Sequence, residues 1–168
     1  MAIADTILPE FDHEAAVTRT VLERVPEEKA GWKPHEKSYS IGDLAAHITN
    51  LATWARMTLQ ESELDLNPPG GPGWKSPTFE STAALLRTFD ENTAAARAAI
   101  LATPDDEMMK PWTLKSGGHE IFTLPRTAVL RSFVFNHTVH HRGQLTVYLR
   151  LLNIPVPEVY GPTADTKN

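Results

Sequence analysis

Apolar residues recur every three or four positions along four stretches of the chain, a spacing that places them on one face of a helix. The four stretches cover about residues 3–25, 40–61, 79–101 and 125–152. Pro26, Pro104 and Pro155 follow the first, third and fourth stretches, where they would end a helix. The second stretch carries a start signal, because the Ser40 hydroxyl can accept from first-turn amides and Asp43 follows three residues later. The pattern therefore predicts four helices.

The segments between these helices are of two kinds. Residues 67–73 are mostly proline and glycine and predict a long loop that is placed to act as a lid. Residues 110–124 predict a small hairpin, because two short strand-like runs flank Gly117 and Gly118. We therefore expect an all-α fold: a four-helix bundle with long connections, a small β-hairpin between helices three and four, and a single domain over residues 1–168.

Composition excludes several kinds of site. The 168 residues include no cysteine, so disulfides, thiolate metal sites and cysteine nucleophiles are excluded. The formal net charge of −5 argues against a nucleic-acid partner, which would require a basic surface. The first ten residues do not resemble a signal peptide, and no apolar run approaches the ~20 residues that span a bilayer. We expect a cytoplasmic protein with no membrane partner.

Three of the seven histidines fall on apolar helix faces. His137 and His141 are four residues apart in the fourth helix, so both lie on one face. His47 lies on the apolar face of the second helix. Three imidazoles can hold Zn, Ni or Fe and leave a coordination position open, as in catalytic sites. The spacing alone is equally compatible with histidines that form hydrogen bonds in the core. This alternative stays open because nothing in the sequence links His47 to the other two.

Other polar residues also lie near these faces. Asn50, Trp54 and Gln144 are within two helical turns of a candidate ligand and are candidates for a pocket lining or for orienting a ligand, with packing or solvation as the alternative. His13, His35, His119 and His140 are expected to be solvated or to point elsewhere. Gly143 costs about 1 kcal/mol relative to alanine within a helix, which predicts a close helix–helix approach there.

Three familiar motifs of enzymes are absent from the sequence. The segment from His137 to His141 lacks the glutamate that serves as general base in H-E-x-x-H. There is no Gly-x-Ser-x-Gly elbow, and the glycine-rich loop lacks the lysine of a phosphate-binding loop. No general base or other catalytic residue is therefore identified.

Three segments carry a wider resemblance. They are Trp32-Lys-Pro34 with Ser40-Ile-Gly-Asp-Leu-Ala-Ala-His47, His137-Thr-Val-His-His-Arg-Gly-Gln-Leu145 with Tyr148-Leu-Arg150, and Pro155-Val-Pro-Glu-Val-Tyr-Gly-Pro162. In this combination the chain resembles the DinB-like (DinB/YfiT) superfamily of metal-binding four-helix bundles. The resemblance implies a metal-binding triad of His47, His137 and His141, and a homodimer.

The resemblance also implies a class of chemistry. Members with known activity include transferases and isomerases that use bacillithiol, mycothiol or glutathione as cosubstrate. We therefore expect one divalent metal per chain, Zn, Ni or Fe, that activates a low-molecular-weight thiol or water for S-transfer, isomerisation or hydrolysis of a small electrophile. The alternative is a non-catalytic, stress-related binding or scaffold module whose metal is structural or absent.

Overall fold

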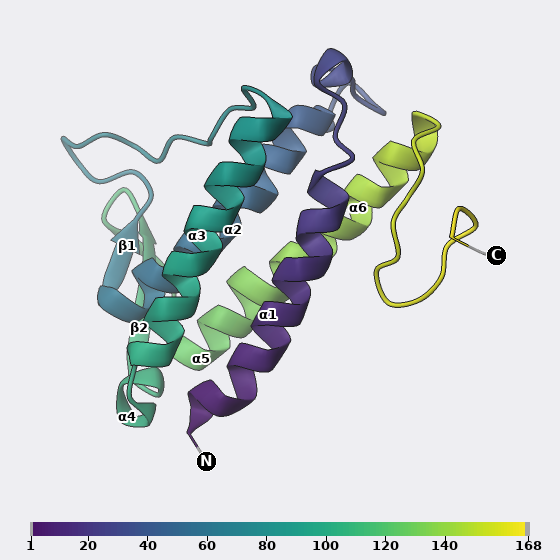
Figure 1. Cartoon of the computed structure of the whole chain (residues 1–168). Coiled ribbons are helices and arrows are strands. Elements are labelled where there is room, and N and C mark those ends of the chain that lie inside the picture. Colours follow the sequence, from purple (N-terminus) through teal and green to yellow (C-terminus); the bar gives the residue numbers. More distant parts are fainter. Residues whose placement is uncertain (1, 167–168) are drawn as a thin grey trace.

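The computed structural model describes residues 2–166, and the chain is mostly helical with a small three-stranded sheet at one end (Figure 1). The long helices are α1 (Ile3–Leu22), α2 (Ile41–Gln60), α3 (Thr82–Ala102) and α6 (His137–Leu151). Short helical segments are η1 (Glu27–Lys29), α4 (Asp105–Met108), α5 (Arg126–Val129) and η2 (Leu130–Asn136). The strands are β1 (Glu63–Asp65), β2 (Pro111–Ser116) and β3 (His119–Pro125). None of the helices within residues 2–166 has the length and apolar character needed to span a bilayer.

Serine side chains begin two of the long helices. The Asp43 amide donates to Ser40 Oγ at 3.1 Å, which confirms the predicted start of α2. The Ala84 amide donates to Ser81 Oγ at 3.1 Å, so α3 begins at Thr82 and not near residue 79 as the apolar pattern predicted. An unsatisfied first-turn amide is stabilised by such a side-chain acceptor, which is why the cap sets the boundary.

The prediction of one continuous fourth helix from about residue 125 to residue 152 is wrong in its interior. The chain there forms α5, then the π-helical segment η2, then α6. A π-helix has a wider turn than an α-helix, which changes the direction of the side chains that follow it. In η2, Val134 and Phe135 are buried among the helices while Phe133 packs on the sheet side.

The packing of the helices places α2 at the centre of the fold. α2 packs against both α3 and α6, and α1 packs against the same two helices. The α2 residues Leu44, Ile48, Leu51 and Ala55 are almost completely buried. One face of α2 therefore lies along α6, and this seam carries the histidines described below.

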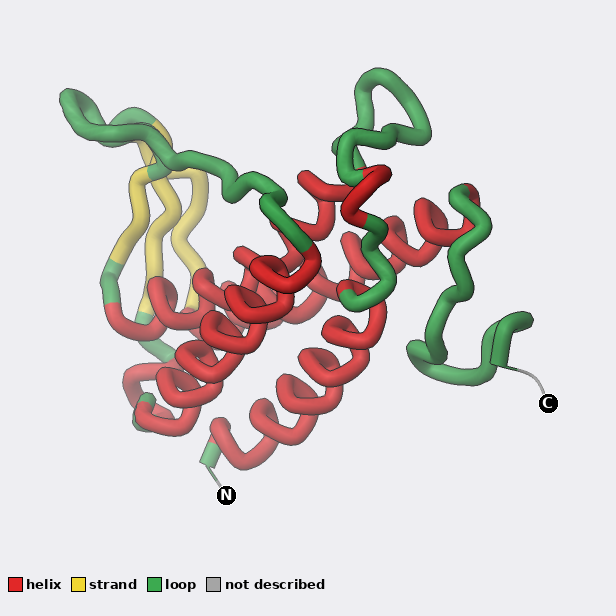
Figure 2. Tube along the Cα trace, turned by 45° about the horizontal axis from the view of Figure 1, so that its top comes forward, coloured by secondary structure: helices red, strands yellow, loops and turns green. Residues whose placement is uncertain are grey.

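The sheet confirms the predicted hairpin and adds a strand to it. β2 and β3 pair antiparallel, and the turn between them uses Gly117 and Gly118, both with positive φ. β1 pairs with β2 in parallel, which the sequence did not predict because a three-residue strand has no pattern of its own. Figure 2 shows the long segment between β1 and α3 running from the sheet to the start of α3.

The close helix–helix approach predicted at Gly143 is wrong. Gly143 is exposed, and a β-carbon added there would have no heavy atom within 4 Å. Its neighbours on the sequence, Arg142 and Gln144, point to opposite sides of α6 and leave the glycine on the open surface. The described residues therefore offer no packing reason for a glycine at this position.

Candidate metal centre

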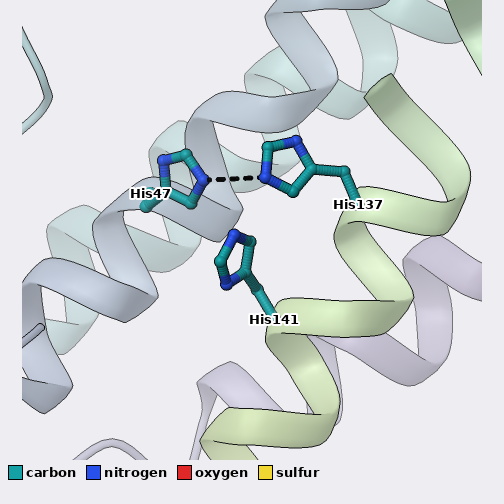
Figure 3. Close-up of side chains that lie close together, drawn as sticks. All are labelled: His47, His137 and His141. Carbon is teal, nitrogen blue, oxygen red and sulfur yellow. Dashed lines mark hydrogen bonds between the residues drawn. The ribbon is translucent and has the colours of Figure 1, made fainter. Parts of the chain in front are cut away.

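Three histidine side chains from two helices converge on the seam between α2 and α6 (Figure 3). His137 is the first residue of α6, and His141 follows one turn later. His47 reaches them from α2, with its Nε2 atom 3.4 Å from Nε2 of His137. One nitrogen from each of the three rings lies within 4.8 Å of the other two. No carboxylate or further histidine joins this group in the part of the chain that the structure describes.

The spacing of these nitrogens fits a metal ion. Two nitrogen ligands at about 2.0–2.1 Å from a tetrahedral zinc ion are separated by roughly 3.3–3.4 Å. The His47–His137 separation of 3.4 Å already has this value. The third nitrogen, from His141, lies within 4.8 Å of the other two and completes the group. The three-histidine group could therefore bind a metal ion.

The electrostatics of the group favour the form of histidine that binds metals. Burial, together with the smaller effects of the nearby His141 and His137, lowers the pKa of His47 to about 4. The pKa values of His137 and His141 are also lowered, again mainly by burial. These shifts favour the neutral form of all three rings at pH 7, and a neutral imidazole carries a lone pair that can bind a cation.

Neighbouring groups fix the orientation of each ring. Nδ1 of His141 lies 2.7 Å from Oε1 of Gln144, so the ring donates there and leaves Nε2 free. A hydrogen bond from His137 to the backbone of Phe133 raises the pKa of His137 slightly against the burial effect, as expected for a carbonyl acceptor. Tyr39 stacks on His47 with ring centroids 5.8 Å apart and planes 16° apart. Sequence reasoning missed Tyr39, because it precedes α2 in an irregular connector.

The remaining candidate residues lie further along the seam. Asn50 is half-buried one turn after His47, with Oδ1 3.5 Å from the Thr53 hydroxyl. Trp54 is half-buried two turns after His47 and stacks on Phe133 with centroids 5.9 Å apart. The four other histidines are exposed, as expected: His13, His35, His119 and His140.

The proline- and glycine-rich loop is tied to the hairpin. The Asp65 carboxylate accepts from the amides of Gly117 and Gly118, and Asn67 Nδ2 donates to Ser116 Oγ at 3.0 Å. The Trp74 amide closes the loop by donating to the Leu66 carbonyl at 2.6 Å. These bonds hold the Trp74 ring beside α2, with its centroid 5.8 Å from that of Trp54. Trp74 directly follows residues 67–73, the segment predicted to act as a lid.

The family and the curated relative that the chain matches both cover nearly its whole length. The model of the DinB family matches residues 1–167. The curated uncharacterized protein YrdA of Bacillus subtilis (strain 168) is 25% identical over 161 residues, which cover 96% of this chain and 90% of YrdA.

Three solved structures share the fold. A DinB-like protein from Bacillus cereus ATCC 10987 superposes with a TM-score of 0.72 at 21% identity, covering 95% of this chain and 98% of that one. The DinB-like protein YjoA from Bacillus subtilis gives 0.68 at 19% identity, covering 92% and 96%. The H52A mutant of a mycothiol-dependent maleylpyruvate isomerase gives 0.50 at 11% identity, covering 93% of this chain and 65% of that protein.

Proposed function

The chain belongs to the DinB family, and from that premise we propose that it is a divalent-metal-dependent enzyme that acts on a small electrophile. His47, His137 and His141 are the proposed ligands of one Zn, Ni or Fe ion per chain. The observation that carries the proposal is the convergence of three neutral imidazoles from α2 and α6, with no carboxylate among them within the described residues.

The donor set supports a catalytic rather than a structural role. A structural zinc site has four protein ligands, whereas three histidines leave a position for water or substrate. A divalent metal held there would supply Lewis-acid activation of a thiol or of water. The chain itself contributes orientation: Gln144 fixes the His141 ring, and Tyr39 covers one face of His47.

A low-molecular-weight thiol is the proposed cosubstrate, with water as the other nucleophile. One structural neighbour is by its name a mycothiol-dependent maleylpyruvate isomerase. This chain has no cysteine, so a thiol nucleophile would have to come from a second molecule. S-transfer, isomerisation and hydrolysis are the reaction types that such a site could support.

The arrangement of subunits and helices forms part of the same proposal. We treat the chain as a single domain in which α1, α2, α3 and α6 make a four-helix bundle. We also propose a homodimer in the cytoplasm. Val147 and Leu151 are more than half exposed on one side of α6 and are the apolar residues that a second copy would cover.

The test of this function is the metal content of tag-free protein, measured by elemental mass spectrometry. We expect about one divalent ion per chain, lost in His47→Ala and His137→Ala with helicity retained in circular dichroism. His140→Ala is the matched control, since His140 is exposed beside His141 and outside the group, and it should retain the ion. A wild-type protein that takes up no Zn, Ni or Fe would favour the alternative of a non-catalytic binding or scaffold module.

A further inference from the structure

Four aromatic side chains continue the seam between α2 and α6 beyond the histidines. We call them the aromatic wall: Trp54, Trp74, Phe122 and Phe133. Trp54 stacks on Phe133 with planes 14° apart, and Phe133 stacks on Phe122 with centroids 4.9 Å apart. Trp74 comes from the loop before α3 and is 39% exposed, while the other three are half-buried.

The wall and the three histidines share the same two chain segments. Trp54 lies seven residues after His47 on α2, and Phe133 lies four residues before His137. The His47–His137 contact joins α2 to the start of α6, and the Trp54–Phe133 contact joins α2 to the segment that leads into α6. Seven helical residues span about 10 Å, which is the length of a small conjugated molecule. Asn50 stands between the two pairs on the same side of α2 and offers a polar group there.

The exposure of the wall distinguishes it from ordinary core. Elsewhere along the α2–α6 seam the packing residues Leu44, Leu145 and Leu149 are completely buried. The wall instead leaves four large rings partly open to solvent beside the three-histidine group. Packing a flat ring against partly exposed aromatic side chains is favourable, because the contact between rings adds to the burial of apolar area.

We propose that the aromatic wall binds a flat aromatic or conjugated ring of the substrate, whose polar head group reaches the three histidines. This inference rests on the proposed function, because the head group needs the metal. The half-buried rings of Trp54 and Phe133 supply the aromatic surface for that ring, and Trp74 on the anchored loop lies beside them. The substrate class is therefore a planar conjugated electrophile and not an aliphatic one.

The test uses three hydroxamates that share one metal-binding head group. They are trans-cinnamohydroxamate, which is flat, 3-cyclohexylpropanohydroxamate, which has the same length with a puckered ring, and acetohydroxamate, which has no ring. Their affinities for zinc-loaded protein are measured by calorimetry. We expect the flat probe to bind about tenfold more tightly than the puckered one, as aromatic stacking would provide.

Single substitutions test which residues cause the preference for the flat probe over the puckered probe. Trp54→Leu and Phe133→Leu should remove the preference for the flat probe and leave acetohydroxamate binding unchanged. Trp74→Ala, at an exposed loop position, tests the same surface without disturbing the core. Trp32→Leu is the matched control, because Trp32 is half-buried at the other end of the seam, where it packs on Tyr148.

The outcomes separate the two proposals. If zinc and acetohydroxamate bind but the flat and puckered probes bind equally, the aromatic wall is only part of the core and this inference is wrong. The same holds if the wall variants keep the preference. If the protein holds no zinc, or zinc-loaded protein binds no hydroxamate, the proposed function fails and the inference fails with it.

Discussion

Arg142 and Glu14 form an ion pair with a separation of 2.7 Å, in which the Arg142 side chain is 1% exposed. Arg142 directly follows His141 in α6 but points to the opposite side, toward α1. The Tyr160 hydroxyl lies 2.7 Å from the same guanidinium and 2.9 Å from the Glu14 carboxylate. One buried cation thus joins α6, α1 and the C-terminal tail behind the histidine face.

Replacing Arg142 should therefore destabilise the fold strongly. In Arg142→Met the Glu14 carboxylate loses its cation while still largely buried, and removing one partner of a buried pair costs about 3–5 kcal/mol. The free energy of unfolding in urea should fall by roughly 3 kcal/mol. The measurement is an equilibrium unfolding curve followed by circular dichroism.

The control for this prediction is Arg150→Met, which removes an arginine from the same helix. Arg150 pairs with Asp165 at the surface, and its side chain is 49% exposed. Exposed pairs contribute about 0–1 kcal/mol, so the free energy of unfolding should change little. If both substitutions lowered the free energy of unfolding equally, the burial of the Arg142–Glu14 ion pair would not explain its contribution to stability.

A second prediction concerns the glutamine that orients His141. Gln144→Leu removes the acceptor of the His141 Nδ1 proton, so the ring loses the partner that keeps Nε2 free. Loss of such an orienting partner lowers metal affinity by about 10–100-fold. Zinc affinity is measured by competition with a chromogenic chelator. Gln144→Glu retains an acceptor oxygen and should keep the affinity, and a loss in that variant as large as in Gln144→Leu would contradict the orienting role.

Local patterns in the sequence account for much of the helical structure. Apolar spacing located the four long helical stretches, Ser40 marked the start of α2, and the Gly117–Gly118 pair marked the hairpin. The four-residue spacing of His137 and His141 placed both on one face of α6. Each of these features depends on residues close together in the chain, which is why they could be predicted.

Features that depend on tertiary packing could not be predicted in the same way. The approach of His47 to His137 joins residues 90 positions apart, and before the structure only the family resemblance linked them. In the π-helical segment before His137, Phe133 packs on the sheet side, and the apolar spacing of the sequence does not indicate this change of turn. The burial of Arg142 depends on its contacts with α1 and the C-terminal tail, and no local pattern in the sequence indicates these contacts.

A third prediction follows from the lowered pKa of His47. The unfolded chain has a histidine pKa near 6.5, whereas the pKa of His47 in the fold is about 4. Between these values the unfolded state binds more protons than the native state, so the stability of metal-free protein falls as pH decreases from about 6.5 toward 4. The lowered pKa values of His137 and His141 act in the same direction.

The check is the urea midpoint of EDTA-treated protein between pH 7.5 and pH 5, a range above the titration of most carboxylates. His47→Gln cannot take up a proton, so its midpoint should depend less on pH than that of the wild type. A wild-type midpoint that rises on acidification would contradict the burial of these imidazoles in their neutral form.

The last prediction concerns Gly143, which has open space around it and lies within α6. Alanine is favoured over glycine inside a helix by about 1 kcal/mol, so Gly143→Ala should stabilise an isolated chain by about that amount. Gly118→Ala is the contrasting control, since Gly118 has a φ of +80° that alanine adopts only with strain, and it should destabilise. Thermal unfolding of both variants at low protein concentration measures the difference. If Gly143→Ala instead lowers stability, and does so more strongly at higher protein concentration, then the open space is filled by a second copy of α6. In that case Gly143 serves the homodimer, beside the exposed Val147 and Leu151.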